Sequence, residues 1–337
     1  MRAVGYQSSL TINQPESLVD IVLETPSPKG RDLLVAIEAV SVNPVDTKVR
    51  MRTGAEPGSW KVLGYDAAGT VVATGPDASL FKPGDAVFYA GALDRPGTNA
   101  EFHLVDERIV GRKPVSLGWA EAAALPLTSI TAWETLFDRL DVKRLVPGVK
   151  PAILIIGGAG GVGSIAIQLA RRLTDLTVIT TASRPETRQW AEALGAHHVL
   201  DHSTPLAPQI TALSLTPGLI FSTTHSDKHQ ADSAQIIAPQ GRFALIDDPA
   251  TFDIGPFKRK CISIHWEFMF TRSLFQTADI AEQGQLLNHV ANLIDEGVLR
   301  STLADRFGPI NAVNLKRAHA LLESGKARGK IVLEGFA

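Results

Sequence analysis

Cysteine is almost absent from this chain, because Cys261 is the only one among its 337 residues. A single thiol excludes an internal disulfide and any zinc or iron–sulfur site built from several thiolates. Net charge is small as well, since 33 Lys and Arg stand against 35 Asp and Glu and leave a formal charge of −2. The chain therefore offers no broad electrostatic attraction to nucleic acid or to an anionic membrane, and we expect neither as a partner.

The N-terminal residues 1–7 lack a long apolar core and a cleavage signature, so we expect no export peptide and a cytoplasmic protein.

Residues 151–170 form an uncharged stretch that is nearly as long as a membrane span. Five glycines interrupt this stretch. It therefore predicts a strand, a turn and a helix rather than a membrane-crossing segment.

The remaining composition is that of an ordinary globular protein, with 45% hydrophobic and 20% charged residues. At roughly 150 residues per domain, the length predicts about two domains. The first part of the chain, up to about residue 125, reads as short strands with turn signals between them, which is typical of a mainly β, barrel-like domain. The predicted strands are Leu33–Val42, Ala67–Thr74, Asp85–Tyr89 and Ala100–Val105.

From about residue 151 the pattern alternates between strands and helices, which predicts a doubly wound parallel sheet. The predicted strands from this point on are Ala152–Ile156, Thr177–Ala182, Gly218–Ser222, Arg242–Ile246, Ile262–Phe268 and Ile331–Leu333. The predicted helices are Val162–Leu173, Pro185–Leu194, Ala278–Glu296 and Asn311–Ser324.

A glycine-rich motif of the form G-x-G-x-x-G lies between the first of these strands and the first helix. In that context it predicts a dinucleotide site, because the first glycine permits a tight turn, the second admits a pyrophosphate and the third lets helix and strand pack closely. Amide groups at the start of the helix then bind phosphate. The predicted cofactor-binding residues here are Gly158, Ala159, Gly160, Gly161, Val162 and Gly163.

The second strand of this region indicates which dinucleotide binds. An NAD site carries an acidic residue about 20 residues after the motif, on the ribose 2′-hydroxyl. This chain has Ser183 and Arg184 after the strand instead, so we expect NADPH, whose 2′-phosphate these side chains would bind. Ser183 also begins a good capping box with Pro185 at the first helical position, and it can serve both purposes.

Besides the glycine-rich turn, four further motifs stand out, namely Ser41–Asp46, Phe81–Asp85, Leu125–Trp133 and Gly329–Leu333. Together these motifs identify the chain as similar to the medium-chain dehydrogenase/reductase superfamily. Within it the chain most resembles the quinone oxidoreductase, or zeta-crystallin-like, branch and the group called zinc-type alcohol dehydrogenase-like proteins. The resemblance covers nearly the whole chain.

The resemblance implies an α/β protein with a discontinuous GroES-like, mainly β catalytic domain, here residues 1–127 and 275–337. A Rossmann domain with a doubly wound parallel sheet, residues 128–274, is inserted into it. NADPH and an oxidised substrate would bind in a cleft between the two. Relatives often form dimers through the last Rossmann strand, so we expect a homodimer through Cys261–Phe268.

A bound zinc ion is not expected, in spite of the group's name. Zinc-dependent relatives carry a cysteine in the segment that matches Asn43 and a His-Glu pair where this chain has Tyr65 and Asp66. The second cysteine ligand and the four-cysteine structural lobe are missing as well. A catalytic zinc site normally has three protein ligands, so we predict no metal-binding residue.

Without a metal, negative charge on the reduced substrate must be stabilised by hydrogen-bond donors. The resemblance implies that Asn43 lies beside the nicotinamide, with Asp46 and Lys48 in the same loop, and that Thr128 contacts the cofactor. Tyr65 is the remaining phenol near the expected cleft, with a core role as its alternative. The predicted catalytic residues are therefore Asn43, Asp46, Lys48 and Tyr65.

These observations predict an NADPH-dependent oxidoreductase that transfers hydride to a quinone or an α,β-unsaturated carbonyl, with no metal ion. Two alternatives stay open. One is a zinc-type alcohol dehydrogenase, which the missing ligands oppose. The other is a non-catalytic, crystallin-like NADPH-binding protein, whose RNA-binding form is opposed by the lack of a basic stripe.

Overall fold

The computed structural model describes residues 1–336, which form two compact units. Unit 1 contains residues 1–130 and 270 onward, and unit 2 contains residues 131–269. The chain thus enters unit 2 once and returns to unit 1. A GroES-like mainly β part and a Rossmann-like parallel sheet are both present, as the sequence predicts.

Unit 1 is built on two sheets, one of three strands in the order β2-β1-β4 and one of seven. The larger sheet has the order β15-β16-β3-β5-β6-β8, with β7 also paired to β3. The strands of the two sheets together are β1 (Arg2–Tyr6), β2 (Val19–Val22), β3 (Asp32–Val42), β4 (Lys61–Val62), β5 (Ala67–Thr74), β6 (Ala86–Tyr89), β7 (Phe102–Asp106), β8 (Gly111–Arg112), β15 (Leu303–Arg306) and β16 (Lys330–Glu334).

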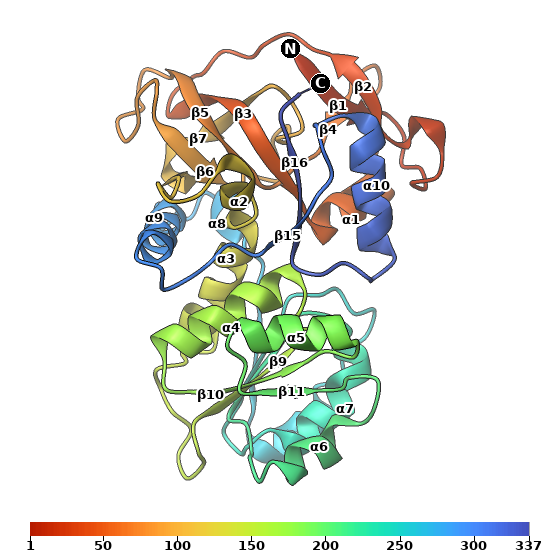
Figure 1. Ribbon diagram of the computed structural model, residues 1–337, viewed down its shortest axis with the longest axis vertical. Helices are drawn as coiled ribbons and strands as arrows, with labels where there is room; N and C mark the ends of the chain where they lie inside the picture. Colours follow the sequence, from red (N-terminus) through yellow and green to blue (C-terminus); the bar gives the residue numbers. More distant parts are fainter. Residues whose placement is uncertain (337) are drawn as a thin grey trace. The chain divides into compact units, whose positions relative to one another are not determined.

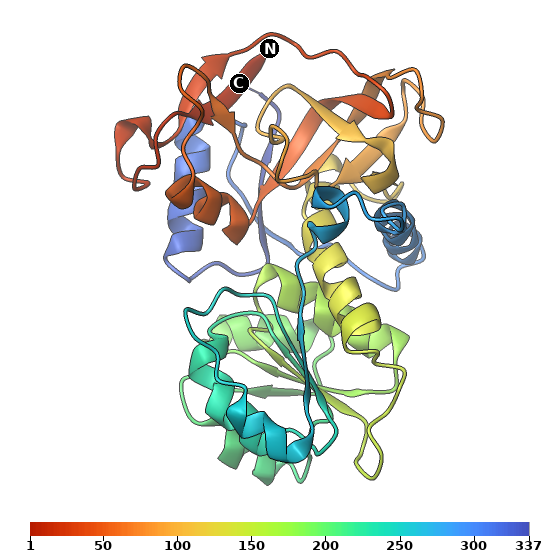
Figure 2. The same ribbon diagram turned by 180° about the vertical axis from the view of Figure 1, so that it is seen from behind.

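Short helices flank these sheets, and α1 and α10 lie side by side in both views (Figures 1 and 2). The chain passes from unit 1 into unit 2 within α3. The α-helices are α1 (Pro44–Arg52), α2 (Trp119–Ala123), α3 (Pro126–Trp133), α8 (Thr271–Leu274), α9 (Glu282–Asp295) and α10 (Ala312–Glu323), with 3-10 turns η1 (Pro15–Ser17) and η2 (Glu107–Ile109).

Unit 2 has one six-stranded sheet, in which every neighbouring pair is parallel and the order is β11-β10-β9-β12-β13-β14. Helices α4 and α5 cover one face and α6 and α7 the other (Figure 1). Both faces are therefore buried, which explains the continuous apolar run of the central strand, where every side chain from Ala152 to Ile156 is at most 1% exposed.

The strands of unit 2 are β9 (Ala152–Ile156), β10 (Thr177–Thr181), β11 (His198–Leu200), β12 (Leu219–Ser222), β13 (Arg242–Leu245) and β14 (Ser263–Trp266). Its helices are α4 (Gly161–Leu173), α5 (Pro185–Ala193), α6 (Leu206–Ala212), α7 (Ser226–Ile236), the π-helical η3 (Glu134–Arg139) and the 3-10 helix η4 (Gly255–Lys260).

Most predicted elements are present within one or two residues, but three expectations need correction. The helix predicted at Ala278–Glu296 is α9, which begins only at Glu282. The segment after Asn43 is a helix, α1, rather than the loop in which we expected Asp46 and Lys48. The buried face of α1 carries Asp46, Thr47 and Arg50, so the sequence has no apolar repeat that would indicate a helix here. The last Rossmann strand is also shorter than predicted, since β14 covers Ser263–Trp266 only.

One buried histidine in unit 1 has a defined protonation state. His103 is 4% exposed and contacts the Tyr89 hydroxyl at 3.1 Å and the Pro96 carbonyl at 2.9 Å. A carbonyl only accepts, so Nε2 of His103 carries the proton and Nδ1 accepts from Tyr89. Burial lowers the pKa of His103 to about 4, because charging the ring would leave it in an apolar interior.

This histidine makes the stability of unit 1 dependent on pH. Its pKa is lower in the folded than in the unfolded chain, so its contribution is complete above pH 6.5 and is lost as the pH falls toward 4. We expect the free-energy difference between wild type and His103→Gln to shrink by about 2 kcal/mol from pH 7 to pH 5. Denaturant unfolding at both pH values measures it, with the exposed His289→Gln as control. Equal pH slopes in wild type and His103→Gln would contradict the assignment.

Candidate functional site

The end of β3 and the start of β5 and β16 in unit 1 carry a buried polar cluster. Asn43 and Asp46 are each 1% exposed, Lys330 is 3% exposed and Asp66 is fully buried. The antiparallel register pairs Ile331 with Val42, which sets Lys330 beside the residue that ends β3. We call Asn43, Asp46, Asp66 and Lys330 the polar cluster.

Lys330 is the cation of the polar cluster. Its Nζ donates to the Asp66 Oδ2 at 2.9 Å, to the Val42 carbonyl at 3.2 Å and to the Asn43 Oδ1. An ammonium group has three donors and no acceptor. All three are therefore engaged by groups of unit 1. The sequence analysis did not select this lysine, although it is the one charge in the short segment Gly329–Leu333.

Asn43 is fully hydrogen-bonded within the same cluster. Its Nδ2 donates to the Asp66 Oδ2 at 2.8 Å and to the Ser41 carbonyl at 3.3 Å, while its Oδ1 accepts from Lys330. Both the nitrogen and the oxygen of this buried amide are therefore hydrogen-bonded inside the protein. This geometry suits a residue that holds other groups in place.

Asp66 connects the cluster to α3. Its Oδ1 accepts from the backbone N–H of Leu127 at 2.7 Å, in the first turn of α3, where helical N–H groups have no partner inside the helix. Burial raises the pKa of Asp66, and the Lys330 ammonium and the hydrogen bond from Leu127 oppose that rise. The carboxylate is thus held in the interior by an opposite charge and by direct donors.

Asp46 performs a related function at the start of α1. Its Oδ2 accepts from the backbone N–H of Asn43 at 2.8 Å, and its Oδ1 accepts from that of Gly64 at 3.0 Å. Pro44 follows at the first helical position and keeps Asn43 extended, so the helix begins at this point. Burial raises the pKa of Asp46 to about 7, opposed by the Asn43 hydrogen bond and by the Lys330 charge.

Tyr65 lies between these groups in the sequence and differs from them in its bonding. Its ring is 1% exposed and packs edge-on against Phe270, with ring centroids 5.5 Å apart. In residues 1–336 no group forms a hydrogen bond with its hydroxyl. Burial raises the pKa of Tyr65, with a further rise from the Asp46 charge, so the phenol keeps its proton. It is a proton-bearing donor next to the polar cluster.

The other two predicted residues of unit 1 occupy different surroundings. Lys48 lies on α1 and is partly exposed. Thr128 is 2% exposed in the first turn of α3, where its hydroxyl donates to the Leu125 carbonyl at 3.1 Å. The Asp66–Leu127 hydrogen bond therefore anchors the turn that carries Thr128.

In unit 2, the glycine-rich motif forms the turn between β9 and α4. A side chain at Gly158 would bring its Cβ to 1.9 Å from the Thr180 Oγ1, and one at Gly163 to 2.3 Å from the Gly157 carbonyl oxygen. Internal packing therefore requires both glycines. The left-handed backbone belongs to Gly157, with φ of 87°, one residue before the glycine to which we assigned the tight turn.

Gly160 is different, because packing inside the protein does not require a glycine there. A Cβ at this exposed position would meet only the Gly157 carbonyl oxygen, at 3.6 Å, which is ordinary van der Waals contact. Gly160 is also the residue that precedes the first turn of α4, whose N–H groups are available to an anion. The turn therefore has the open backbone that a phosphate group needs.

The end of β10 carries hydroxyl and basic groups and no acid. The Thr181 Oγ1 accepts from the Gly157 N–H at 3.0 Å and lies 3.1 Å from Nδ1 of His202. Burial lowers the pKa of His202, and the nearby charges of His225 and Arg184 lower it further, against the Asp201 carboxylate. The sequence analysis missed His202, which lies 18 residues beyond Arg184 and reaches this point only through the pairing of β11 with β10.

The capping expected for Ser183 is wrong. Helix α5 begins after Arg184, whose N–H donates to the Thr187 Oγ1 at 3.2 Å. Ser183 is exposed and does not cap the helix. The Arg184 Nε lies 3.2 Å from the Glu186 carboxylate, at the surface.

The residues that match the zinc ligands of relatives do not form a metal site. Within residues 1–336 no three His, Cys, Asp or Glu side chains lie close enough to share an ion. The Asn43 Oδ1 accepts from Lys330, and the two Asp66 oxygens accept from Leu127, Asn43 and Lys330. The donor set therefore does not fit a catalytic zinc ion.

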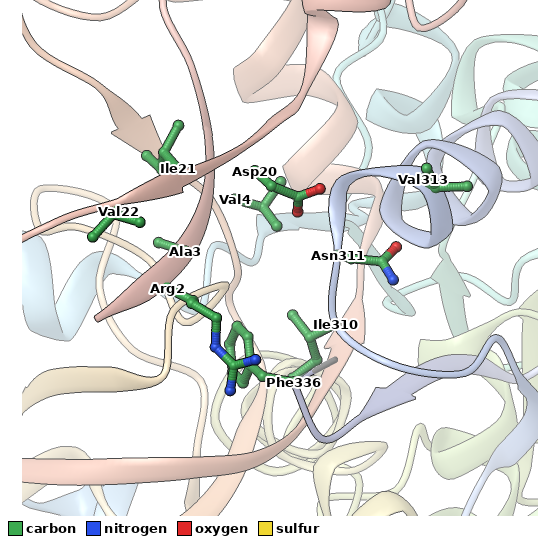
Figure 3. A pocket seen from close by; sticks show the side chains of 10 residues that line it. All are labelled: Arg2, Ala3, Val4, Asp20, Ile21, Val22, Ile310, Asn311, Val313 and Phe336. Carbon is green, nitrogen blue, oxygen red and sulfur yellow. The ribbon is translucent and has the colours of Figure 1, made fainter.

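Other surfaces are less suited to catalysis. Unit 1 has a pocket with a volume of about 440 Å³. Figure 3 shows the side chains that line it. Its two charged side chains already have partners, because Arg2 pairs with Glu101 and Asp20 accepts from the Ala312 N–H. None of the helices in residues 1–336 is both long enough and apolar enough to cross a bilayer.

At one edge of the unit 2 sheet, β14 pairs only with β13 among the residues that the structure describes. Trp266 is 56% exposed on this strand, and Phe268 just beyond it is 47% exposed. Large exposed apolar side chains beside an open strand edge are typical of a surface that pairs with another chain.

Comparison with known families assigns both parts of the chain. The profile of the alcohol dehydrogenase GroES-like domain matches residues 29–131, and that of the zinc-binding dehydrogenase family matches residues 194–333. The name of the second family refers to zinc, whereas the residues described above do not provide ligands for a zinc ion.

Individual relatives agree with this assignment. A zinc-type alcohol dehydrogenase-like protein of Staphylococcus aureus (strain COL) is 40% identical over 339 residues, which cover 99% of each chain. A crystal structure from Rhizobium etli CFN 42, provisionally called a zinc-dependent alcohol dehydrogenase, is 67% identical, with a TM-score of 0.98 over 100% of this chain and 98% of that one. The 2-methylene-furan-3-one reductase of Solanum lycopersicum is 29% identical over 99% of this chain and 79% of its own length.

The two matched profiles, the parallel sheet with its glycine-rich turn and the full-length likeness at 40% identity lead to one assignment. The chain belongs to the medium-chain dehydrogenase/reductase superfamily of oxidoreductases, in the group of zinc-type alcohol dehydrogenase-like proteins.

Proposed function

We propose that this protein is an NADPH-dependent, zinc-independent oxidoreductase that transfers hydride to a quinone or an α,β-unsaturated carbonyl compound. The observation that carries the proposal is the turn between β9 and α4, in which Gly158 and Gly163 are required by packing while Gly160 is left open. An open glycine at the start of a helix suits the pyrophosphate of a dinucleotide.

NADPH is favoured over NADH by the groups after β10. Ser183 is exposed and takes no part in capping, Arg184 follows it, and the His202 imidazole lies near that arginine. A guanidinium and a hydroxyl are suitable partners for a 2′-phosphate, whereas NAD sites place a carboxylate at this position. When bound, the cofactor supplies the hydride.

Unit 1 supplies the groups that act on the substrate. We assign the Tyr65 hydroxyl as the hydrogen-bond donor to the substrate oxygen. Burial keeps this hydroxyl protonated, and no group in residues 1–336 forms a hydrogen bond with it. Asn43 and Asp46 hold the surrounding backbone through their buried hydrogen bonds. We also propose that Lys48 contacts the substrate and that Thr128 contacts the cofactor.

The substrate class follows from chemistry and from one relative. A furanone with an exocyclic double bond, the substrate named for the tomato relative, is an α,β-unsaturated carbonyl. Reduction of such a compound needs hydride, a proton and a donor for the oxygen, and no metal ligand. A zinc-type alcohol dehydrogenase is less well supported, because the polar cluster lacks the ligands for a zinc ion.

We further propose that the protein is a cytoplasmic homodimer joined through β14. The exposed Trp266 and the open edge of this strand favour pairing with a second copy.

The direct test is the oxidation of NADPH by the purified protein with a panel of quinones and enones, followed at the absorbance of the reduced nicotinamide. We expect turnover with at least one acceptor, unchanged after treatment with a metal chelator. Intact NADPH binding with no turnover on any acceptor would favour the non-catalytic alternative, and loss of activity on chelation would favour the zinc enzyme.

Cofactor preference should follow the residues after β10. The double substitution Ser183→Asp with Arg184→Ile removes the cation and restores the carboxylate found in NAD sites. We expect the preference for NADPH over NADH, measured as the ratio of dissociation constants, to fall by about ten- to a hundredfold. Equal affinity of the wild-type protein for both cofactors would contradict the assignment of the 2′-phosphate site.

Tyr65→Phe removes only the proposed donor. We expect kcat to fall by about 100-fold with little change in the dissociation constant of NADPH, since a positioned donor to developing negative charge contributes at that scale. Tyr6→Phe is the matched control, because the Tyr6 hydroxyl is bonded to the Thr53 carbonyl at 2.8 Å and is fully buried in the same unit. An unchanged kcat in Tyr65→Phe would remove Tyr65 from the site.

A further inference from the structure

The loop between β12 and α7 lies directly against the glycine-rich turn of unit 2. The parallel register sets Ser222, the last residue of β12, beside Ile156, the last residue of β9. Thr223 then donates to the Ile156 carbonyl twice, from its backbone N–H at 3.1 Å and from its hydroxyl at 2.8 Å. The loop therefore continues the pairing of these two strands beyond the sheet.

Gly157 is the residue at which this loop meets the turn. It has a left-handed φ of 87°, and a Cβ there would lie 2.4 Å from the Thr223 Oγ1. From β10, on the opposite side of β9, the Thr181 Oγ1 accepts from the Gly157 N–H at 3.0 Å, and the Thr181 carbonyl accepts from the Gly158 N–H at 3.1 Å. The start of the turn is thus held from both neighbouring strands.

Thr181 belongs to a strand, whereas Thr223 lies in a loop, and that loop is fixed by Asp247, two residues after β13. The Asp247 Oδ2 accepts from the Ser226 N–H at 2.8 Å, and its Oδ1 accepts from the Ser226 hydroxyl. The Ser226 Oγ also lies 2.7 Å from the Ser222 Oγ, and both serines are fully buried. One carboxylate therefore ties together the residue that ends β12 and the residue that begins α7.

The backbone of this loop needs such a constraint. His225 has a φ of 50°, in the left-handed region that residues other than glycine rarely adopt. Residues in this region persist where the surrounding contacts over-determine them. The bonds from Ser226, the next residue, to Asp247 supply that constraint.

We propose that Asp247 is a positioning residue of the dinucleotide site: its carboxylate fixes the loop between β12 and α7, and the loop fixes Gly157 and the turn that receives the pyrophosphate. The inference rests on the proposed function for the identity of the ligand and on contacts inside unit 2 for the positioning. Asp247 acts through Ser226 and Thr223 rather than on the cofactor.

The charge of Asp247 makes the direction of its effect informative. A dinucleotide is an anion, so the loss of a carboxylate near its site would, by charge alone, strengthen binding. The loss of the hydrogen bonds to Ser226 would instead loosen the loop and weaken binding. Variants that remove the charge with and without these bonds therefore separate the two effects.

Two substitutions at Asp247 make this comparison. Asp247→Ala removes the charge and the bonds, whereas Asp247→Asn removes the charge but keeps one acceptor and adds a donor for Ser226. We expect the dissociation constant of NADPH to rise about tenfold in Asp247→Ala and not to rise in Asp247→Asn. NADH should weaken by the same factor as NADPH in Asp247→Ala, because both carry the pyrophosphate. Wild-type affinity in Asp247→Ala would overturn the proposal.

Asp232→Ala is the matched control. Asp232 lies on α7 and accepts from the Leu206 N–H at 2.6 Å, so it too is a carboxylate of unit 2 that holds the start of a helix, here α6. We expect both alanine variants to lower the midpoint of thermal unfolding, but Asp232→Ala to keep the wild-type dissociation constants. An equal loss of affinity in the two variants would assign the effect to lost stability and overturn the positioning role.

Amide hydrogen exchange of the protein without cofactor tests the positioning in the absence of any ligand. We expect the amides of Gly157 and Gly158 to exchange about tenfold faster in Asp247→Ala than in the wild type, because the loop beside them is released, and Asp232→Ala to match the wild type. Wild-type exchange at both glycines in Asp247→Ala would overturn the proposal.

The exchange measurement also separates this inference from the proposed function. If wild-type protein bound neither NADPH nor NADH, the proposed function would fail, while the exchange rates would still decide whether Asp247 shapes the turn. If Asp247→Ala does not fold by circular dichroism, Ser226→Ala carries the same comparisons, because it removes the hydroxyl between Asp247 and Ser222.

Discussion

The buried ion pair of Lys330 and Asp66 is the constraint on which the arrangement of unit 1 depends. A carboxylate with no exposed surface persists there because an ammonium, a side-chain amide and a backbone N–H all bond to it. Each of these partners comes from a different segment of the chain. The need to compensate one buried charge therefore brings together the end of β3, the start of α3 and the start of β16.

Unit 2 achieves its geometry by different means, since its turn depends on steric packing rather than on charge. Gly158 and Gly163 are glycines because Thr180 and the Gly157 carbonyl leave no room for a Cβ, while Gly160 has room to spare. The contrast separates the two glycines that internal packing requires from one that it does not require. The polar cluster of unit 1 thus depends on hydrogen-bonding capacity, and the turn of unit 2 depends on the absence of side-chain volume.

Much of the fold could be predicted because its signals are local. The central strand β9 is a continuous apolar run, and the helix after it has a clear apolar stripe, so both were predicted almost to the residue. Helix α1 was missed because its buried face carries Asp46, Thr47 and Arg50, which no hydrophobic pattern shows. The capping of α5 was assigned to Ser183 although Thr187 performs it, since several hydroxyl groups near a helix start fit the same pattern.

The sequence by itself determined the superfamily, the parallel sheet, the glycine-rich turn and the absence of a site built from several thiolates. Each of these follows from contiguous residues or from a residue type that is nearly missing. Only the tertiary structure decided that Lys330 bonds Asn43 and Asp66, that these side chains are saturated, and that His202 lies beside the end of β10. Such contacts join residues up to 287 positions apart. No local pattern encodes them, since strand pairing, and not spacing along the chain, sets which side chains meet.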